Sequence, residues 1–133
     1  MTSVMTTEIL IKSIPLENNL LISFYDGSRK IAGDRWQIIV TARINIAVDQ
    51  VQFTRTDMNE ISEITKKIGD NVVFEKQLIR NFIDETQKEV MVKSLYESFL
   101  HNTLSYISHR QFAEKFVIKT YADTLEKCKW VKN

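Results

Sequence analysis

One short segment of the chain concentrates side chains that can bind an anion. Residues 25–36 read YDGSRKIAGDRW and hold two of the three glycines, two large aromatic residues and five charged residues. Guanidinium, ammonium and hydroxyl groups beside glycine amides can cradle a phosphate or a carboxylate, and an aromatic ring can stack on a planar group. The candidate ligand-binding residues are Ser28, Arg29, Lys30, Asp34, Arg35 and Trp36.

The same segment also fits a structural connection between two strands. Gly27 and Gly33 can adopt positive φ angles in a turn, and the cations can pair locally with Asp26 and Asp34. A P-loop is excluded, because the two glycines are one residue too far apart and Asp34 occupies the position of the lysine. We favour the structural interpretation and keep anion binding as the alternative.

The segment also carries a recognisable pattern, whose residues are Tyr25, Asp26, Ser28, Arg29, Ala32, Gly33, Asp34, Arg35 and Trp36. In this pattern, residues 20–48 resemble a family of small, functionally uncharacterised bacterial proteins. The resemblance implies a bacterial domain of a recurring type and brings no assigned reaction with it.

A row of polar side chains on the longest predicted helix has the residue types of a hydrolase triad. Glu97, His101 and Ser105 are spaced four residues apart and therefore share one helix face. A serine in the middle of a helix has no free backbone amides beside it, because those amides bond within the helix, so no oxyanion hole can form there. We expect this face to be solvated or packed against a partner, and we predict no catalytic residue.

The chain offers few ligands for a metal ion. Its two histidines, His101 and His109, would lie about 12 Å apart along a continuous helix, which is too far for one ion. The single cysteine, Cys128, excludes an internal disulfide and a multi-thiolate site, and we expect it to be buried or inert. We therefore predict no metal site and no cofactor, and we favour a protein that is not an enzyme.

Strands dominate the first third of the chain. Residues 8–14 and 20–25 are apolar runs separated by Pro15 and a polar turn, which indicates a hairpin. From residue 36 to 48 every second residue is apolar, which predicts a strand with one buried and one largely wet face. Because this strand is long, we expect a bend or a bulge in it.

Helices dominate the rest. Asp57 has capping-box spacing to Glu60, and Gly69 stands where such a helix would end. Residues 72–83 fit both a strand and a helix, and their β-branched opening favours the strand. Two further helices are predicted over residues 85–107 and 109–127.

These elements predict a single α+β domain over residues 1–133. An antiparallel sheet of three to four strands in the N-terminal half packs against two or three helices in the C-terminal half. The apolar arc of the 85–107 helix covers more than half of its circumference. Such a helix has room for a second neighbour beside the sheet, either another helix or another subunit.

The net charge and the N-terminal sequence limit the classes of partner and the location that we expect. Lysine and arginine number 18 and aspartate and glutamate 17, and a net charge of +1 gives no bulk reason to bind nucleic acid or an anionic membrane. The N-terminal sequence MTSVMTTEIL lacks the basic and apolar regions of a signal peptide, and no apolar run approaches the roughly 20 residues of a membrane helix. We expect a cytoplasmic protein without nucleic-acid or membrane partners.

Two functions follow as hypotheses. The first is a non-enzymatic binding domain whose partner is another protein or a second copy of the chain. The second is a domain that binds a small anion, such as a nucleotide, through residues 26–36.

Overall fold

The fold is seen in a computed structural model, which describes residues 8–54 and 56–131 and, for residues 128–131, the backbone alone. The Cys128 side chain and the N-terminal residues 1–7 lie outside this description. None of the described helices combines the length and the apolar character that crossing a membrane requires.

The chain folds as an α+β protein with an antiparallel sheet, as predicted. Its strands are β1 (Ile9–Pro15), β2 (Leu21–Asp26), β3 (Arg29–Ala32), β4 (Arg35–Ala47) and β5 (Asn71–Asp84). Its helices are α1 (Met58–Ile68), α2 (Lys88–Ile107) and α3 (Phe112–Val131), with short 3-10 turns η2 (Val48–Gln50) and η3 (Glu85–Gln87). The described sheet has five strands rather than three or four, because residues 29–32 pair with β4 as well.

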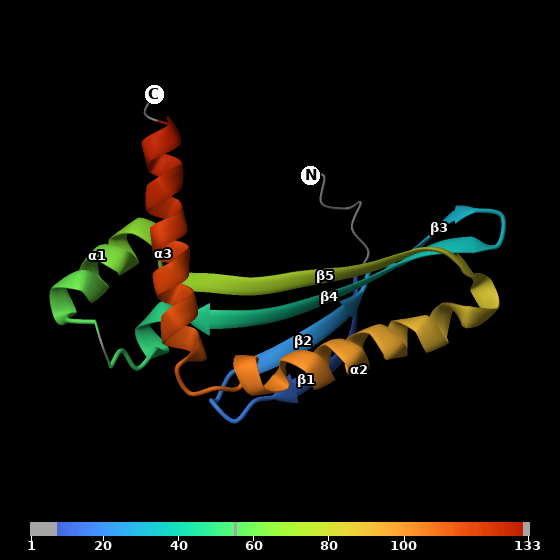
Figure 1. The fold of residues 1–133 in the computed structure, drawn as a ribbon, viewed down its shortest axis with the longest axis horizontal. Helices are drawn as coiled ribbons and strands as arrows, with labels where there is room; N and C mark the ends of the chain where they lie inside the picture. Colours follow the sequence, from blue (N-terminus) through green and yellow to red (C-terminus); the bar gives the residue numbers. More distant parts are fainter. Residues whose placement is uncertain (1–7, 55, 132–133) are drawn as a thin grey trace.

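β4 is the central strand. Along one side it pairs with β2 and then with β3, and along the other side it pairs with β5 over its full length. The register between β4 and β5 shifts once, since Trp36 pairs with Ile83 but Ile38 pairs with Arg80. Gln37 therefore faces two residues of β5, so the extra residue lies in β5 rather than in the long strand where a bulge was expected. Figure 1 shows β5 along one long edge of the sheet and β1 along the other.

The alternation predicted for residues 36–48 places the core. Its buried members are Ile38, Val40, Ala42, Ile44, Ile46 and Val48. α2 packs on this face, where the Phe24 ring of β2 lies 5.4 Å from the Tyr96 ring and 6.2 Å from the Phe99 ring. The opposite face of β4 is less exposed to solvent than predicted, because Thr41 is fully buried there and Arg43 is half-buried.

The structure resolves the ambiguous segment as a strand. Pairing with β4 places Lys76 and Arg80 on the same face as Phe74 and Leu78. The long open edge of a sheet can carry such cations, whereas a buried helix face could not.

The helices begin and end close to the predicted residues. The Asp57 carboxylate accepts a hydrogen bond from the Glu60 amide at 2.8 Å, and Gly69 ends α1 with a φ of 88°. α3 starts at Phe112 rather than residue 109. The turn before it is held by Asn18, whose amide nitrogen donates to the carbonyl oxygens of Ile107 and His109 at 2.8 and 3.0 Å.

α3 stands at one end of the sheet and runs on past β5 (Figure 1). Its first turns are anchored by an aromatic cluster, in which the Phe74 ring lies 5.5 Å from the Phe112 ring and 5.6 Å from the Phe116 ring. The side of α3 that faces away from this cluster contacts α1. The helices therefore cover the core face from two sides and leave part of β5 between them.

Candidate functional site

Residues 26–36 form most of a hairpin rather than an open loop. The reversal is made by Gly33 and Asp34, with Ala32 paired to Arg35 and a φ of 54° at Gly33. A positive φ at the first central residue is typical of a type II′ turn, which favours glycine there. Gly27 has no positive φ, and its amide donates to the Ile39 carbonyl at 2.9 Å.

Ser28 fills the gap between β2 and β3. Its amide donates to the Asp26 carboxylate at 2.9 Å, and its hydroxyl oxygen accepts from the Ile39 amide at 3.0 Å. The side chains of Asp26 and Ser28 thus replace ladder hydrogen bonds where two strands meet. This use of the two residues is structural.

The cations of the predicted site lie on both faces of the hairpin. Arg29 is opposite Gln37 and Lys30 is opposite Trp36, and neighbouring positions on a strand point to opposite faces. Arg29 Nε donates to Gln37 Oε1 at 2.9 Å, whereas Lys30 Nζ lies 3.8 Å from Glu85 Oε1. The two side chains therefore do not converge on a single anion.

The remaining predicted residues meet the turn that follows β5. Arg35 Nη1 lies 3.4 Å from the Asp84 carboxylate and 3.6 Å from that of Asp34. Trp36 Nε1 donates to Glu85 Oε1 at 3.2 Å, and the Lys88 ammonium lies 4.1 Å from the centre of the Trp36 ring. Arg35 and Trp36 are thus engaged by groups of the chain itself. These pairs are about half exposed, so each contributes little to stability.

Residues 26–36 contribute only half of this cluster. Asp84, Glu85 and Lys88 come from a segment about fifty positions further along the chain. The pairing of β5 with β4 brings them to the hairpin, and no local pattern in the sequence specifies that pairing.

The polar row on α2 is exposed along its length. Glu97, His101 and Ser105 are all solvent-accessible, and no hydrogen bond joins them among the described residues. Ser105 borders a separate cavity of about 170 Å³ together with Tyr106, His109, Phe112 and Lys115. No group of three metal-ligating side chains is clustered within the described ranges.

A second surface was not expected from the sequence. We call the β5 side chains Phe74, Lys76, Leu78 and Arg80 the β5 shelf. They share the face that α2 covers, but α2 packs mainly against β4 and leaves them at its flank. Phe74 and Leu78 are half-buried, whereas Lys76 and Arg80 are exposed.

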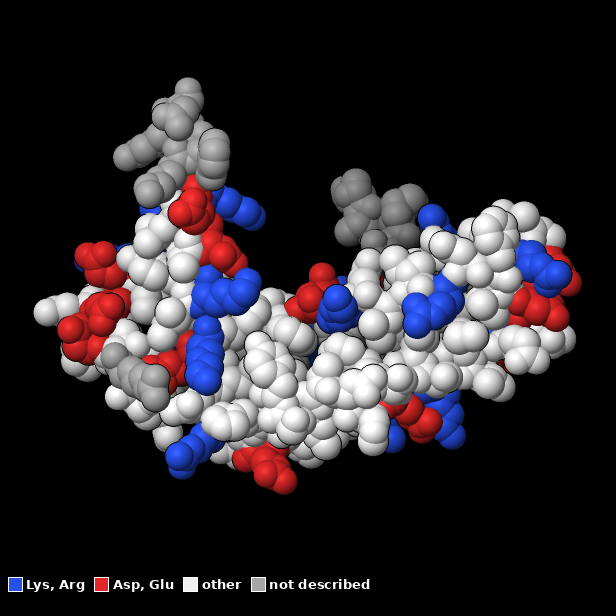
Figure 2. All heavy atoms as spheres, in the orientation of Figure 1, with Lys and Arg blue, Asp and Glu red and all other residues white. Residues whose placement is uncertain are grey.

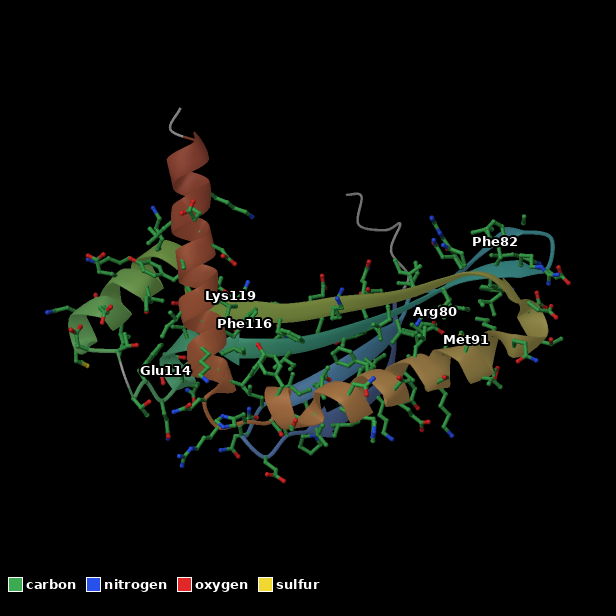
Figure 3. The ribbon with its side chains drawn as sticks, in the orientation of Figure 1. Arg80, Phe82, Met91, Glu114, Phe116 and Lys119 are labelled. Carbon is green, nitrogen blue, oxygen red and sulfur yellow. The ribbon has the colours of Figure 1, made fainter. Side chains whose placement is uncertain are left out.

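Figure 2 shows this side of the molecule, with basic and acidic side chains next to one another over the strands and along α3. In Figure 3, Arg80 lies beside Met91 of α2, and Phe116 and Lys119 of α3 border the far end of the shelf. Neither Lys76 nor Arg80 forms an ion pair within the described part of the chain, and Arg80 Nη1 donates to the Ile79 carbonyl at 2.8 Å.

No model of a known protein family matches this chain, and neither a curated protein nor a solved structure matches it at a significant level. The function is therefore inferred from the geometry of this chain's own residues.

Proposed function

We propose that this chain is a non-enzymatic protein-interaction domain and that the β5 shelf is its binding surface. The observation that carries the proposal is the continuity of half-buried apolar side chains, Phe74, Leu78 and Phe116, with two cations that lack an acidic partner in the described structure. A contiguous apolar patch rimmed by polar groups is typical of an interaction site.

A further feature supports binding. Tyr106, at the end of α2, packs its ring 5.2 Å from Phe112 yet remains 59% exposed. Exposed aromatic residues of this kind are enriched at interfaces. We also propose that the chain meets its protein partner in a bacterial cytoplasm, which is what the resemblance of residues 20–48 to a bacterial family implies.

The experiment is an affinity capture from the native host with three forms of the tagged chain. The first is the unchanged protein, the second carries Lys76→Glu and Arg80→Glu, and the third carries Lys66→Glu and Lys67→Glu on the exposed face of α1. We expect proteins that are retained by the first and third forms and lost with the second. Identical captured sets for all three would refute the shelf as the binding surface.

A second candidate function uses Arg29. Its Nε bonds Gln37, and its two terminal nitrogens have no hydrogen-bonding partner among the described residues, so they remain available to an anion. Thermal shifts should then appear with inorganic phosphate or a nucleotide and vanish in Arg29→Ala, while Lys93→Ala on α2 keeps them. Equal shifts in both variants would remove this candidate.

A further inference from the structure

β5 is a long strand whose outer edge is open. It spans 14 residues and pairs with β4 on one side, and no other described strand pairs with it (Figure 1). The backbone N–H and C=O groups on such an edge are a template for another strand. The regular part ends at the bulge opposite Gln37, where Phe82 has a φ of 56°.

The side chains on the shelf face alternate in character. Phe74 and Leu78 are apolar, and Lys76 and Arg80 are cationic, with successive members two residues apart. On the opposite face of β5, the Glu75 carboxylate already pairs with Arg43. The unpaired charge of this edge is therefore positive and confined to the shelf.

We propose that the open edge of β5 binds an extended acidic segment of a partner protein by strand addition. This inference rests on the proposed function and names the partner's chemistry. In an antiparallel pair, directly opposite residues share a face and contact each other. A segment with carboxylates opposite Arg80 and Lys76 and apolar residues opposite Leu78 and Phe74 would continue the sheet and neutralise the shelf.

The same cations select between partners. Charged side chains on an edge strand disfavour pairing with an apolar strand, because burying them unpaired is costly. A strand with carboxylates at the matching positions removes that cost, because each carboxylate pairs with a cation of the shelf. The shelf cations therefore disfavour an apolar strand and favour an acidic one.

A second copy of the chain fits less well. Two β5 strands paired antiparallel about Leu78 would set Lys76 of one copy opposite Arg80 of the other, and pairing about Lys76 would set Lys76 opposite itself. Like charges directly opposite each other destabilise a strand pair. A register about Gln77 avoids this repulsion by setting Lys76 opposite Leu78, but it leaves both cations without an acidic partner, so charge complementarity favours a different chain that carries acidic residues.

The experiment uses the full chain and a synthetic peptide in which glutamate and valine alternate at every second position, with threonine between them. Fluorescence anisotropy measures its binding to the unchanged protein, to Lys76→Glu/Arg80→Glu and to Lys66→Glu/Lys67→Glu. We expect binding by the first and third forms and at least about tenfold weaker binding by the shelf variant. A peptide with lysine in place of glutamate should show the reverse preference. Methylation of alternate peptide amides should abolish binding, because strand addition needs them as donors.

Three results would overturn the inference. They are failure of the glutamate peptide to bind, binding that survives amide methylation, and light scattering that shows a dimer dissociated by the shelf variant. If captured proteins are lost with the shelf variant while the peptide fails, the interaction function stands and strand addition falls. If the captured set does not change, the proposed function itself falls.

Discussion

At the scale of single residues, Arg43 joins more of the sheet than any side chain of the predicted site. It lies on the face opposite α2, and its two terminal nitrogens donate to the Glu8 carboxylate at 2.8 and 3.0 Å. Its Nε donates to Glu75, and its guanidinium carbon lies 4.9 Å from the centre of the Tyr25 ring. The hydrogen bonds that Arg43 donates to Glu8 and then to Glu75 raise the pKa of Arg43, against the opposing effect of burial.

Replacing Arg43 should destabilise the sheet. Arg43→Ala removes hydrogen bonds between charged groups from three strands or their ends, and we expect it to lower the free energy of unfolding by about 1–3 kcal/mol in urea denaturation. Arg43→Lys keeps the charge but loses the two-pronged geometry, so its loss should be smaller. An unchanged unfolding midpoint for Arg43→Ala would show that the cluster is too solvated to matter.

Phe82 has a strained backbone conformation, and most of its side chain is exposed to solvent. Its φ of 56° lies in the left-handed region, and its side chain is 72% exposed. A left-handed conformation costs a residue other than glycine about 1–2 kcal/mol. The bulge opposite Gln37 imposes this conformation at the end of the regular β5 edge.

Phe82→Gly should therefore stabilise the protein by up to about 1 kcal/mol, because it relieves the strain and loses little packing. Phe82→Val should destabilise it, since a β-branched residue is poorly tolerated at positive φ. Thermal unfolding of the two variants measures both effects. A loss of stability in Phe82→Gly would reveal that the phenyl ring makes a stabilising contact.

At the scale of elements, the two hairpin glycines have different roles. Gly33 has a φ of 54°, whereas a Cβ added at Gly27 would come no closer than 3.6 Å to a neighbouring side chain. We predict that Gly33→Ala costs about 1–2 kcal/mol and that Gly27→Ala changes stability by less than about 0.5 kcal/mol. Denaturant titration of both variants provides the comparison, and equal costs would contradict the role of the turn.

A buried carboxylate holds the connection before α1 against α3. Glu114, which is buried, accepts from the Thr54 amide at 3.1 and 3.2 Å, from the Thr54 hydroxyl at 3.0 Å and from the Thr56 hydroxyl at 3.3 Å. Its place in the first turn of α3 also suits its charge, since the helix N-terminus is electropositive.

Glu114→Ala should lower the free energy of unfolding by about 1–3 kcal/mol, because it removes a buried, charged acceptor of the hydrogen bonds from Thr54 and Thr56. Hydrogen exchange at the Thr54 amide should speed up in parallel. Glu126→Ala, which changes an exposed carboxylate on the same helix, is the matched control and should leave both measurements unchanged. Equal behaviour of the two variants would refute the bracing role.

At the scale of the whole molecule, α3 is attached to the sheet through few contacts. The Phe74, Phe112 and Phe116 rings join its first turns to β5, and the rest of the helix extends toward α1 and beyond the sheet. This arrangement leaves the β5 shelf open between α2 and α3.

The aromatic cluster should therefore govern the docking of α3. Phe74→Ala is expected to cost about 2–4 kcal/mol of stability, whereas Val73→Ala, on the exposed opposite face, should cost less than about 1 kcal/mol. Urea unfolding followed by tryptophan fluorescence and by circular dichroism tests this pair. Similar costs for both variants would mean that α3 docks by other contacts.

The sequence by itself determined the features that depend on neighbouring residues. The alternation of residues 36–48 identified the buried face of β4, and Asp57 and Gly69 marked the ends of α1, because strand period and helix capping are local properties. The concentration of charge at residues 26–36 was likewise visible without a fold. The residues that those charges contact could not be identified from the sequence.

Only the tertiary structure decided which residues far apart in the sequence contact each other. The Trp36 side chain donates a hydrogen bond to Glu85, 49 positions further along the chain, and the Asn18 side chain donates one to the Ile107 carbonyl, 89 positions further along. These contacts arise from the pairing of β4 with β5 and from the placement of α2, which no local pattern specifies. The open edge of β5 is decided in the same way, because a strand's own sequence does not tell whether a neighbour will cover it.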